Sequence, residues 1–460
     1  MNQVKLLARR QQTTKLSMKR VACVLSLLAG LCLIPSTALA QGAEPTVNPA
    51  NTAWILTATA LVLFMTIPGL SLFYAGLVRR KNVLSVLMHC FMIMAVMSVL
   101  WLVCGYSLAF GEASPYCGGL AKVFAGGVDA SSTEGDSGKA IPEYLFMAFQ
   151  MTFFIITPAL MVGAFVERMK FSAMVLFTTL WAILVYAPVC HWVWGDNGFM
   201  LGWGTKDLAG GIVVHITAGI GALVVCIMVG PRKGYRTAQF QPHNLPMCVM
   251  GTGMLWVGWF GFNAGSGLAA NGDAAQTLFV THISAATATI VWSLAEKLKH
   301  GKASVLGAVT GSIAGLAAIT PASGDVGPIG GLAIGAAAGF ICWVASTSVK
   351  SKFGYDDSLD VFGVHGVGGL VGTLMVAFFA STTLGGKGVI SIPDAETYSV
   401  GAQFLVQLKA SAIVIVYTLI VSVIILYLVK AICGGSLRAS ESEEEEGLDL
   451  TAHGESGYNN

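Results

Sequence analysis

The stretch DLAGGIVVH, residues 207 to 215, carries an aspartate and, eight residues later, a histidine in an otherwise apolar run. The stretch DDSLDVFGVH, residues 356 to 365, repeats this spacing, because Asp357 precedes His365 by eight residues. The two aspartates, Asp207 and Asp357, are 150 residues apart, and so are the two histidines, His215 and His365. A spacing that recurs in matching register predicts that both copies contribute to one site.

Composition places the chain in a lipid bilayer. Of its 460 residues, 55% are hydrophobic and 11% are charged, and the mean hydropathy is +0.72, whereas soluble domains carry about 25% charged residues. The net charge of +2, without a separate basic stripe, predicts no nucleic-acid partner. The ten cysteines stand singly and are expected to be buried hydrophobic residues rather than metal ligands. Neither H-E-x-x-H nor G-x-S-x-G occurs, so we expect no enzyme and no cofactor.

The first 40 residues are predicted to be a signal peptide that is cleaved after Ala40. Six basic residues precede an apolar run from Val21 to Ile34, and Pro35 and the small residues Ala38 and Ala40 follow it. The alternative is an uncleaved first span, but the run is shorter than the roughly 20 residues that a crossing helix needs. Translation from Met18 is an alternative start. Either way, the mature chain is expected to begin outside the cytoplasm.

The rest of the chain predicts an all-α membrane protein. Residues 41–432 are expected to form a domain of eleven transmembrane helices, and residues 433–460 a cytoplasmic tail. The expected spans are Ala53 to Leu77, Val83 to Phe110, Tyr144 to Val166, Ser172 to His191, Leu208 to Val229, Met247 to Asn263, Thr277 to Leu298, Leu306 to Thr320, Ile329 to Val349, Phe362 to Ala380 and Phe404 to Ile432.

Basic residues between the spans support an orientation. An external start followed by eleven crossings puts the C-terminus in the cytoplasm, and cytoplasmic loops should then hold most Lys and Arg. Thirteen Lys and Arg fall in loops assigned to the inside and four in loops assigned to the outside. The inner residues are Arg79, Arg80, Lys81, Arg168, Lys170, Arg232, Lys233, Arg236, Lys297, Lys299, Lys302, Lys350 and Lys352, and the outer ones are Lys122, Lys139, Lys206 and Lys387.

This topology relates the two aspartate–histidine stretches as an inverted repeat of two five-helix halves, followed by one final helix. The fifth span runs inward from Asp207 and the tenth runs outward from Asp357. Eight helical residues cover about 12 Å, which is close to the middle of a bilayer core about 30 Å thick. His215 and His365 are therefore predicted to meet there as neutral imidazoles, because desolvation disfavours the charged ring. The alternative for the two histidines is an ordinary role in the core, and the alternative for the two aspartates is helix capping alone.

Five stretches of the sequence form a combined pattern. They are ALVLFMTIPGLSLFYAGLVRRKNVLSVL (60 to 87), DLAGGIVVHI (207 to 216), PHNLPM (242 to 247), GWFGFNAGS (258 to 266) and DVFGVHGVGG (360 to 369). These stretches resemble the ammonium transporter family, the Amt/Mep/Rh group, and are similar to its bacterial Amt members. The resemblance runs from about residue 50 to the C-terminus. It implies an eleven-helix protomer in the bacterial cytoplasmic (inner) membrane, usually a homotrimer, with a hydrophobic pore through each subunit.

The resemblance assigns roles to single residues. An external substrate-binding site is implied for Phe153, Trp194 and Ser266. Phe149, one turn before Phe153, is expected to add to this vestibule or to have an ordinary packing role. A phenyl gate is implied for Phe153 and Phe262. The matching pore histidines are His215 and His365, and the acid needed for transport is Asp207.

The implied activity is uptake of ammonium, with methylammonium as an analogue. Aromatic faces attract the cation by about 0.5 to 2 kcal/mol, and a serine hydroxyl accepts one of its N–H bonds. Ammonium is expected to lose a proton, so that ammonia crosses the apolar pore, while sodium and potassium cannot shed their charge. Net ammonium movement is expected, with a proton left outside as the alternative. A sensor and a neutral gas or water channel are the rival functions.

The tail contains an acidic block, Glu441 and Glu443 to Glu446, which alone predicts a solvated, disordered segment. However, EGLDLTAHGESGY resembles the ordered tail of the family and implies a PII-type nitrogen-regulatory protein as partner. Two features depart from the family pattern. Lys409 stands where bacterial relatives often carry an acid, and the outer loop 119–144 matches no pattern.

Overall fold

The computed structural model describes residues 46–238, 240–388 and 398–458. The predicted signal peptide and the cleavage after Ala40 lie outside these residues. Within them, the regular secondary structure is helical apart from one short antiparallel pair of strands, β1 and β2. Ten of the described helices are long and apolar enough to cross a membrane, and an eleventh apolar helix, Val305–Ile319, has 15 residues. The prediction of a helical, multi-pass membrane protein is confirmed.

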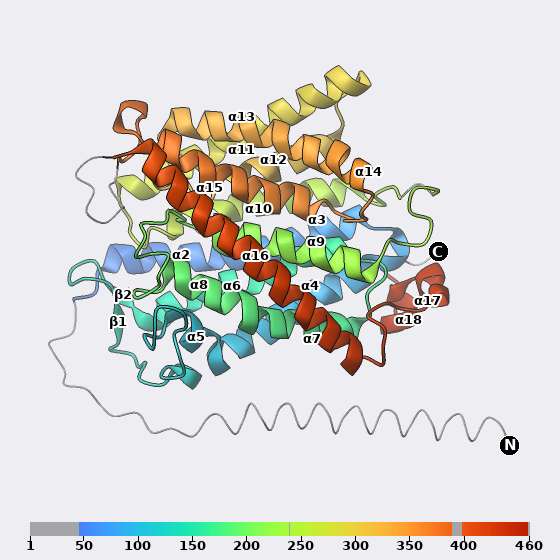
Figure 1. Ribbon diagram of the computed structural model, residues 1–460, viewed down its shortest axis with the longest axis horizontal. Coiled ribbons are helices and arrows are strands. Elements are labelled where there is room, and N and C mark those ends of the chain that lie inside the picture. Colours follow the sequence, from blue (N-terminus) through green and yellow to red (C-terminus); the bar gives the residue numbers. More distant parts are fainter. Residues whose placement is uncertain (1–45, 239, 389–397, 459–460) are drawn as a thin grey trace. The chain divides into compact units, whose positions relative to one another are not determined.

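The elements before residue 230 form one group of roughly parallel helices, with the β1–β2 ribbon at one end (Figure 1). They are α2 (Pro49–Phe64), η1 (Met65–Leu70), α3 (Ser71–Leu77), η2 (Arg80–Asn82), α4 (Val83–Leu100), η3 (Trp101–Gly105), α5 (Tyr106–Phe110), η4 (Val123–Ala125), β1 (Thr133–Glu134), β2 (Ile141–Pro142), α6 (Glu143–Phe165), α7 (Phe171–Trp181), η5 (Ala182–Tyr186), α8 (Ala187–Trp194), η6 (Gly211–Ile216) and α9 (Thr217–Val229).

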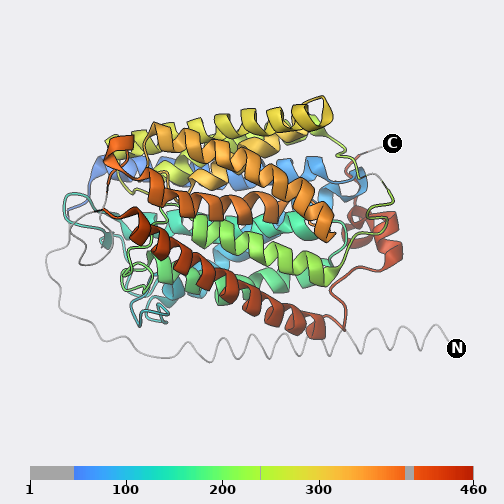
Figure 2. The same ribbon diagram turned by 45° about the horizontal axis from the view of Figure 1, so that its top comes forward.

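The elements after residue 240 complete the bundle. The longest of the described helices, α16, crosses the others obliquely and packs on α7, α9 and α15 (Figures 1 and 2). These elements are α10 (Leu245–Gly265), α11 (Gly272–His300), α12 (Val305–Ile319), α13 (Pro328–Val344), η7 (Ala345–Val349), α14 (Lys350–Phe353), η8 (Phe362–Gly366), α15 (Val367–Phe379), η9 (Thr382–Leu384), α16 (Val400–Ile432), α17 (Glu441–Glu446) and α18 (Leu448–His453).

Short polar residues set where many of these apolar helices begin. A side-chain oxygen that accepts a hydrogen bond from the first helical turn satisfies a backbone N–H that has no partner within the helix. This explains why helices of nearly uniform hydrophobicity still begin at defined residues. The capping side chains are Asn48 for α2, Asn244 for α10, Asn271 for α11, Ser304 for α12 and Ser399 for α16.

The C-terminal tail folds onto the helix ends opposite the β1–β2 ribbon (Figure 1). The Asp449 carboxylate accepts the N–H groups of Leu84 and Ser85 at 3.0 and 2.7 Å, and so caps the start of α4. The Asn82 side chain accepts the N–H of Leu448 at 2.9 Å. These bonds tie α18 to the beginning of the second span.

Basic residues hold the acidic block of the tail. Glu444 is buried and pairs with Arg438, with 2.7 Å between Nη2 and Oε2. Lys233 lies 2.6 Å from Glu445 and 3.3 Å from Glu441, but these groups are exposed. The block is therefore structured where it meets arginine, although its composition alone indicates disorder.

A buried carboxylate, Glu167, joins three loops at the same end of the bundle. Its Oε1 accepts the backbone N–H of Arg79 at 2.8 Å, and its Oε2 lies 3.0 Å from the Arg79 guanidinium and 3.3 Å from that of Arg232. Burial alone would raise the pKa of Glu167, but Arg232 and Arg79 hold it below its ordinary value. Arg232 also pairs with Asp356 at 2.8 Å, so the network extends to the loop before His365.

Replacing this carboxylate should destabilise the fold. We expect Glu167→Gln to lower the free energy of unfolding by about 3 kcal/mol, because the buried Arg232 guanidinium would lose one of its two carboxylate partners and Arg79 would lose its own. Glu445→Gln, at an exposed ion pair, should have no measurable effect. Titration with SDS, followed by tryptophan fluorescence, measures both. Because the Glu167 pKa is lowered, Glu167 stabilises the fold at neutral pH, and this stabilisation is lost as the pH falls through the lowered pKa. If acid lowered the free energy of unfolding of the wild type no more than that of Glu167→Gln, this expectation would be wrong.

Candidate functional site

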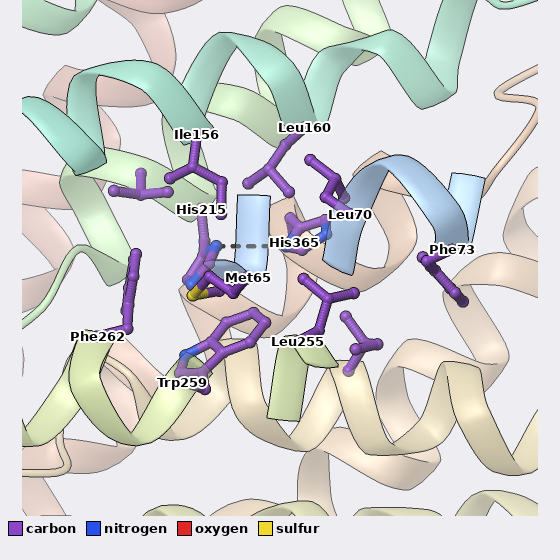
Figure 3. Close-up of a pocket in the computed structure, with 12 residues that line it drawn as sticks. Met65, Leu70, Phe73, Ile156, Leu160, His215, Leu255, Trp259, Phe262 and His365 are labelled. Carbon is purple, nitrogen blue, oxygen red and sulfur yellow. Dashed lines mark hydrogen bonds between the residues drawn. The ribbon is translucent and has the colours of Figure 1, made fainter. Parts of the chain in front are cut away.

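The structure brings His215 and His365 into contact. Their Nδ1 atoms are 3.3 Å apart, the rings stack at 5.2 Å between centroids, and both side chains are buried (Figure 3). Figure 3 shows Phe262 beside His215 and Phe73 beyond His365. The pair borders a cavity of about 10 Å³, close to the volume that admits one water molecule. The rest of its lining is apolar or aromatic: Met65, Leu70, Phe73, Ile156, Leu160, Val214, Leu255, Trp259, Phe262 and Ile313.

Both histidines lie in π-helical turns, His215 in η6 and His365 in η8. The His215 N–H donates to the carbonyl of Gly210, five residues back, at 2.8 Å. The widened turn is a local distortion that is common at functional sites. The histidines therefore share their helical conformation as well as their spacing from an aspartate.

Glycines allow the two histidine-bearing segments to touch. A Cβ atom on Gly219 would lie 2.3 Å from the Cα of Gly366, which follows His365. A Cβ on Gly369 would lie 2.8 Å from the Cβ of His215. Since real side chains do not approach this closely, only glycine permits this backbone crossing.

The two aspartates cap their helices to different extents. The Asp207 carboxylate accepts four backbone N–H groups at 2.6 to 3.0 Å, from residues 210 to 213. The Asp357 Oδ2 accepts the N–H of Phe362 at 2.7 Å, whereas its Oδ1 has no hydrogen-bond partner in the part of the chain that the structure describes. Capping, which the sequence predicted for both, is extensive at Asp207 and partial at Asp357.

An aromatic row leads to the histidines. Phe153 and Phe262 are in contact, with 4.4 Å between ring centroids and a tilt of 37° between the rings, and Phe149 contacts Phe153 edge-on at 5.1 Å. Phe149 and Phe153 are fully buried, and Phe153 lies ten residues after Glu143, the first residue of α6. An external site would put Phe153 near one end of its helix, but Phe153 lies about 15 Å along α6 from Glu143.

Sequence reasoning missed Trp259. Its ring stacks on His215 at 5.5 Å, and its Nε1 donates to Thr320 at 2.9 Å. Trp259 lies one helical turn before Phe262, so the spacing of three residues could have placed it on the same face. It supplies one wall of the cavity beside the histidines (Figure 3).

A second cavity, of about 220 Å³, is lined by Glu134 of β1 and so lies at the end of the bundle that carries the β1–β2 ribbon. Trp194 and Ser266 line it, and the Trp194 Nε1 donates to the carbonyl of Asp207 at 2.7 Å. Phe149 and Phe153 do not line this cavity. The loop 119–144, which matched no pattern, contributes Lys122 and Glu134, and the remaining lining residues are Phe110, Glu112, Phe146, Gln150, Asp196, Leu208 and Leu268.

The chain is similar to known proteins over most of its length, both in sequence and in structure. Residues 53–458 match the Ammonium Transporter Family. An ammonium transporter of Aquifex aeolicus is 44% identical over 430 residues, which cover 94% of this chain and 98% of that protein. The chain belongs to the ammonium transporter family. The structure is also similar to that of Saccharomyces cerevisiae Mep2, with a TM-score of 0.77, 32% identity and coverage of 86% of this chain and 88% of that one.

A further neighbour is a sensor Amt protein, with a TM-score of 0.80, 27% identity and coverage of 88% of this chain and 98% of that one. The family assignment confirms the resemblance stated from the five sequence stretches. It also confirms that the protein is no enzyme, because the ammonium transporter family is a transport family.

Lys409 departs from the family pattern. Its Nζ lies over the ring of Trp203, 3.5 Å from the ring centroid.

The close contact between Gly219 and Gly366 can be tested by adding one methyl group. We expect Gly219→Ala to force α9 away from η8, because its Cβ would clash with the Gly366 backbone. Uptake of methylammonium should fall at least about tenfold, which corresponds to about 1.4 kcal/mol. Gly253→Ala on α10 is the control, since a Cβ there meets no described atom within 4 Å. Equal uptake by both variants would mean that the crossing does not position the histidines.

Proposed function

We propose that the protein takes up ammonium across the membrane by deprotonating it and conducting ammonia past the His215–His365 pair. The observation that carries this proposal is the contact of two buried imidazoles at 3.3 Å in a narrow apolar cavity. A buried polar group is costly in a membrane and is found where a solute passes or a partner binds it. The geometry suits a small uncharged molecule with N–H donors and one acceptor.

Recruitment is proposed for the outer cavity. The Trp194 ring offers a cation–π surface, and the Ser266 hydroxyl, whose proton is donated to the Phe262 carbonyl at 2.7 Å, keeps its lone pairs as acceptors. Three carboxylates also line this cavity, which favours cations over anions. Burial and the nearby Asp196 raise the pKa of Glu134. The carboxylates are Glu112, Glu134 and Asp196.

The gate is proposed to exclude ions that cannot lose their charge. Phe153 and Phe262 pack against each other between the outer cavity and the histidines, and neither ring can replace a hydration shell. Phe149 supports the gate by packing on Phe153. Ammonium leaves its proton on the outer side of this phenyl pair, and Asp207 holds the helix start that carries His215.

The Nδ1–Nδ1 contact restricts how the two rings can be protonated. One Nδ1 must carry the proton and the other must accept it, so the rings are complementary tautomers. Two imidazolium rings would set two N–H donors against each other. A neutral pair with one donor and one acceptor can therefore pass a proton along, and we propose net ammonium movement, which is electrogenic.

Current measurements in proteoliposomes test this function. We expect vesicles with the wild-type protein to carry inward current with ammonium and methylammonium. The double variant His215→Ala, His365→Ala should carry a current at least about tenfold smaller, because a positioned proton carrier is removed. His282→Ala is the control, since His282 is an exposed histidine on α11. Uptake without current would make the protein a neutral gas channel, and unchanged current in the double variant would remove the relay.

The wider organisation follows from the family. We propose eleven spans in two inverted five-helix halves plus α16, with residues 41–432 as the transport domain after cleavage at Ala40. The protein is proposed to be a homotrimer in the inner membrane, with a periplasmic N-terminus and a cytoplasmic C-terminus. The basic loops support this orientation, because Arg79, Lys81 and Arg232 cluster with the tail at one end.

The tail, residues 433–460, is proposed to regulate transport by binding a PII-type protein. We expect the purified transporter to retain purified PII on a column, and a variant that lacks residues 440–460 to retain less than about one tenth as much. Lys409→Ala, at an exposed site on α16, is the control. Equal retention with and without the tail would exclude the tail as the binding element.

A further inference from the structure

Helix α16 carries two buried amides that the transport site does not use. Gln403 is 1% exposed and Gln407 is 0% exposed. They are four residues apart and so lie on the same face of an otherwise largely apolar helix. Burying an amide is unfavourable unless its hydrogen bonds are made. The hydrogen-bond partners of these two amides therefore show which segments of the chain α16 anchors.

Gln407 binds both backbone groups of one residue. Its Oε1 accepts the N–H of Lys206 at 2.8 Å, and its Nε2 donates to the carbonyl of Lys206 at 2.7 Å. The same Nε2 donates to the carbonyl of Thr373 at 3.1 Å, and Oε1 also accepts from Gln403 at 3.2 Å. All four hydrogen-bonding positions of the Gln407 amide are thus filled.

The residue that Gln407 holds comes directly before Asp207. The Asp207 carboxylate caps η6, which contains His215, and the Asp207 carbonyl accepts the indole N–H of Trp194 at 2.7 Å. The backbone position of Lys206 therefore fixes both the start of the His215 turn and the orientation of the Trp194 ring.

The second anchor of Gln407 reaches the other histidine. Thr373 lies on α15, which continues from the η8 turn that contains His365. Gln407 thus joins both histidine-bearing segments to one point on α16. The Lys206 side chain adds little to this anchor, since its ion pair with Asp325, at 3.3 Å, is partly exposed.

We infer that Gln407 is a positioning residue for transport. It does not line either cavity, and it acts through the Lys206–Asp207 backbone on Trp194 and His215. This inference rests on the proposed function for its effect on uptake. Its structural part, the restraint of residues 206 to 213, stands apart from any activity.

Gln407→Met tests the inference, because methionine keeps the length of the side chain but makes none of its hydrogen bonds. Hydrogen–deuterium exchange of the full-length protein in nanodiscs reports the amides of residues 210 to 213, which bind Asp207. We expect their exchange to be about tenfold faster or more. The KM for methylammonium uptake should rise at least about threefold, since Trp194 loses its fixed orientation.

Two matched variants accompany this measurement. Ser411→Ala, one turn further along α16, changes a buried hydroxyl with no hydrogen-bond partner among the described residues, and should leave exchange and KM within about twofold. Gln403→Met removes the bonds to Gly204 and to Gln407, and should give a smaller increase in exchange. It also keeps the inference testable if Gln407→Met does not fold.

Unchanged exchange in both glutamine variants would overturn the inference. A second outcome would also overturn it: exchange becomes faster, the KM stays unchanged, and the maximal rate falls only in proportion to the amount of folded protein. That result would show that Gln407 stabilises the fold without positioning the transport site. A wild type that moves no ammonium would reject the proposed function, whereas the exchange measurement would still decide whether Gln407 holds this turn.

Discussion

The structure depends on one constraint, which is that two imidazoles must face each other inside an apolar bundle. A buried ring nitrogen is costly without a partner, and His215 and His365 supply one to each other through their Nδ1 atoms, whereas the His215 Nε2 has none among the described residues. This contact requires the helices to cross at backbone distance, which the glycine pair Gly219 and Gly366 permits. The surrounding rings and aliphatic side chains leave a cavity for about one small molecule.

The two ends of the helical bundle hold the aspartate-headed turns differently, although the sequence repeat is regular. At the end that carries the β1–β2 ribbon, Asp207 satisfies four backbone N–H groups, and Gln407 binds the residue before it. At the end that carries the tail, Asp357 satisfies one N–H by a side-chain bond, while the nearby loop is held by the Arg232–Asp356 pair. The first helix start is therefore held by hydrogen bonds to a carboxylate and an amide, and the loop at the second by an ion pair.

Much of this site could be predicted from the sequence because its signals are local. The eight-residue spacing predicted where the histidines lie along their helices, and hydropathy predicted the spans. Spacing alone could not reveal Gln407, whose partners lie 201 and 34 residues away. It also could not show that Phe149 and Phe153 are buried and do not line the cavity beside Trp194 and Ser266, or that the loop 119–144 lines it. These features depend on packing between helices, for which one sequence carries no periodic signal.

Nitrogen-15 NMR of the histidine side chains tests the central claim most directly. The transporter would be labelled at histidine and studied in bilayers at neutral pH, with His215→Asn and His365→Asn used to assign the two rings. We expect two neutral imidazoles of opposite tautomer, one protonated at Nδ1 and the other at Nε2. An imidazolium signal from either ring, or the same tautomer in both, would contradict it.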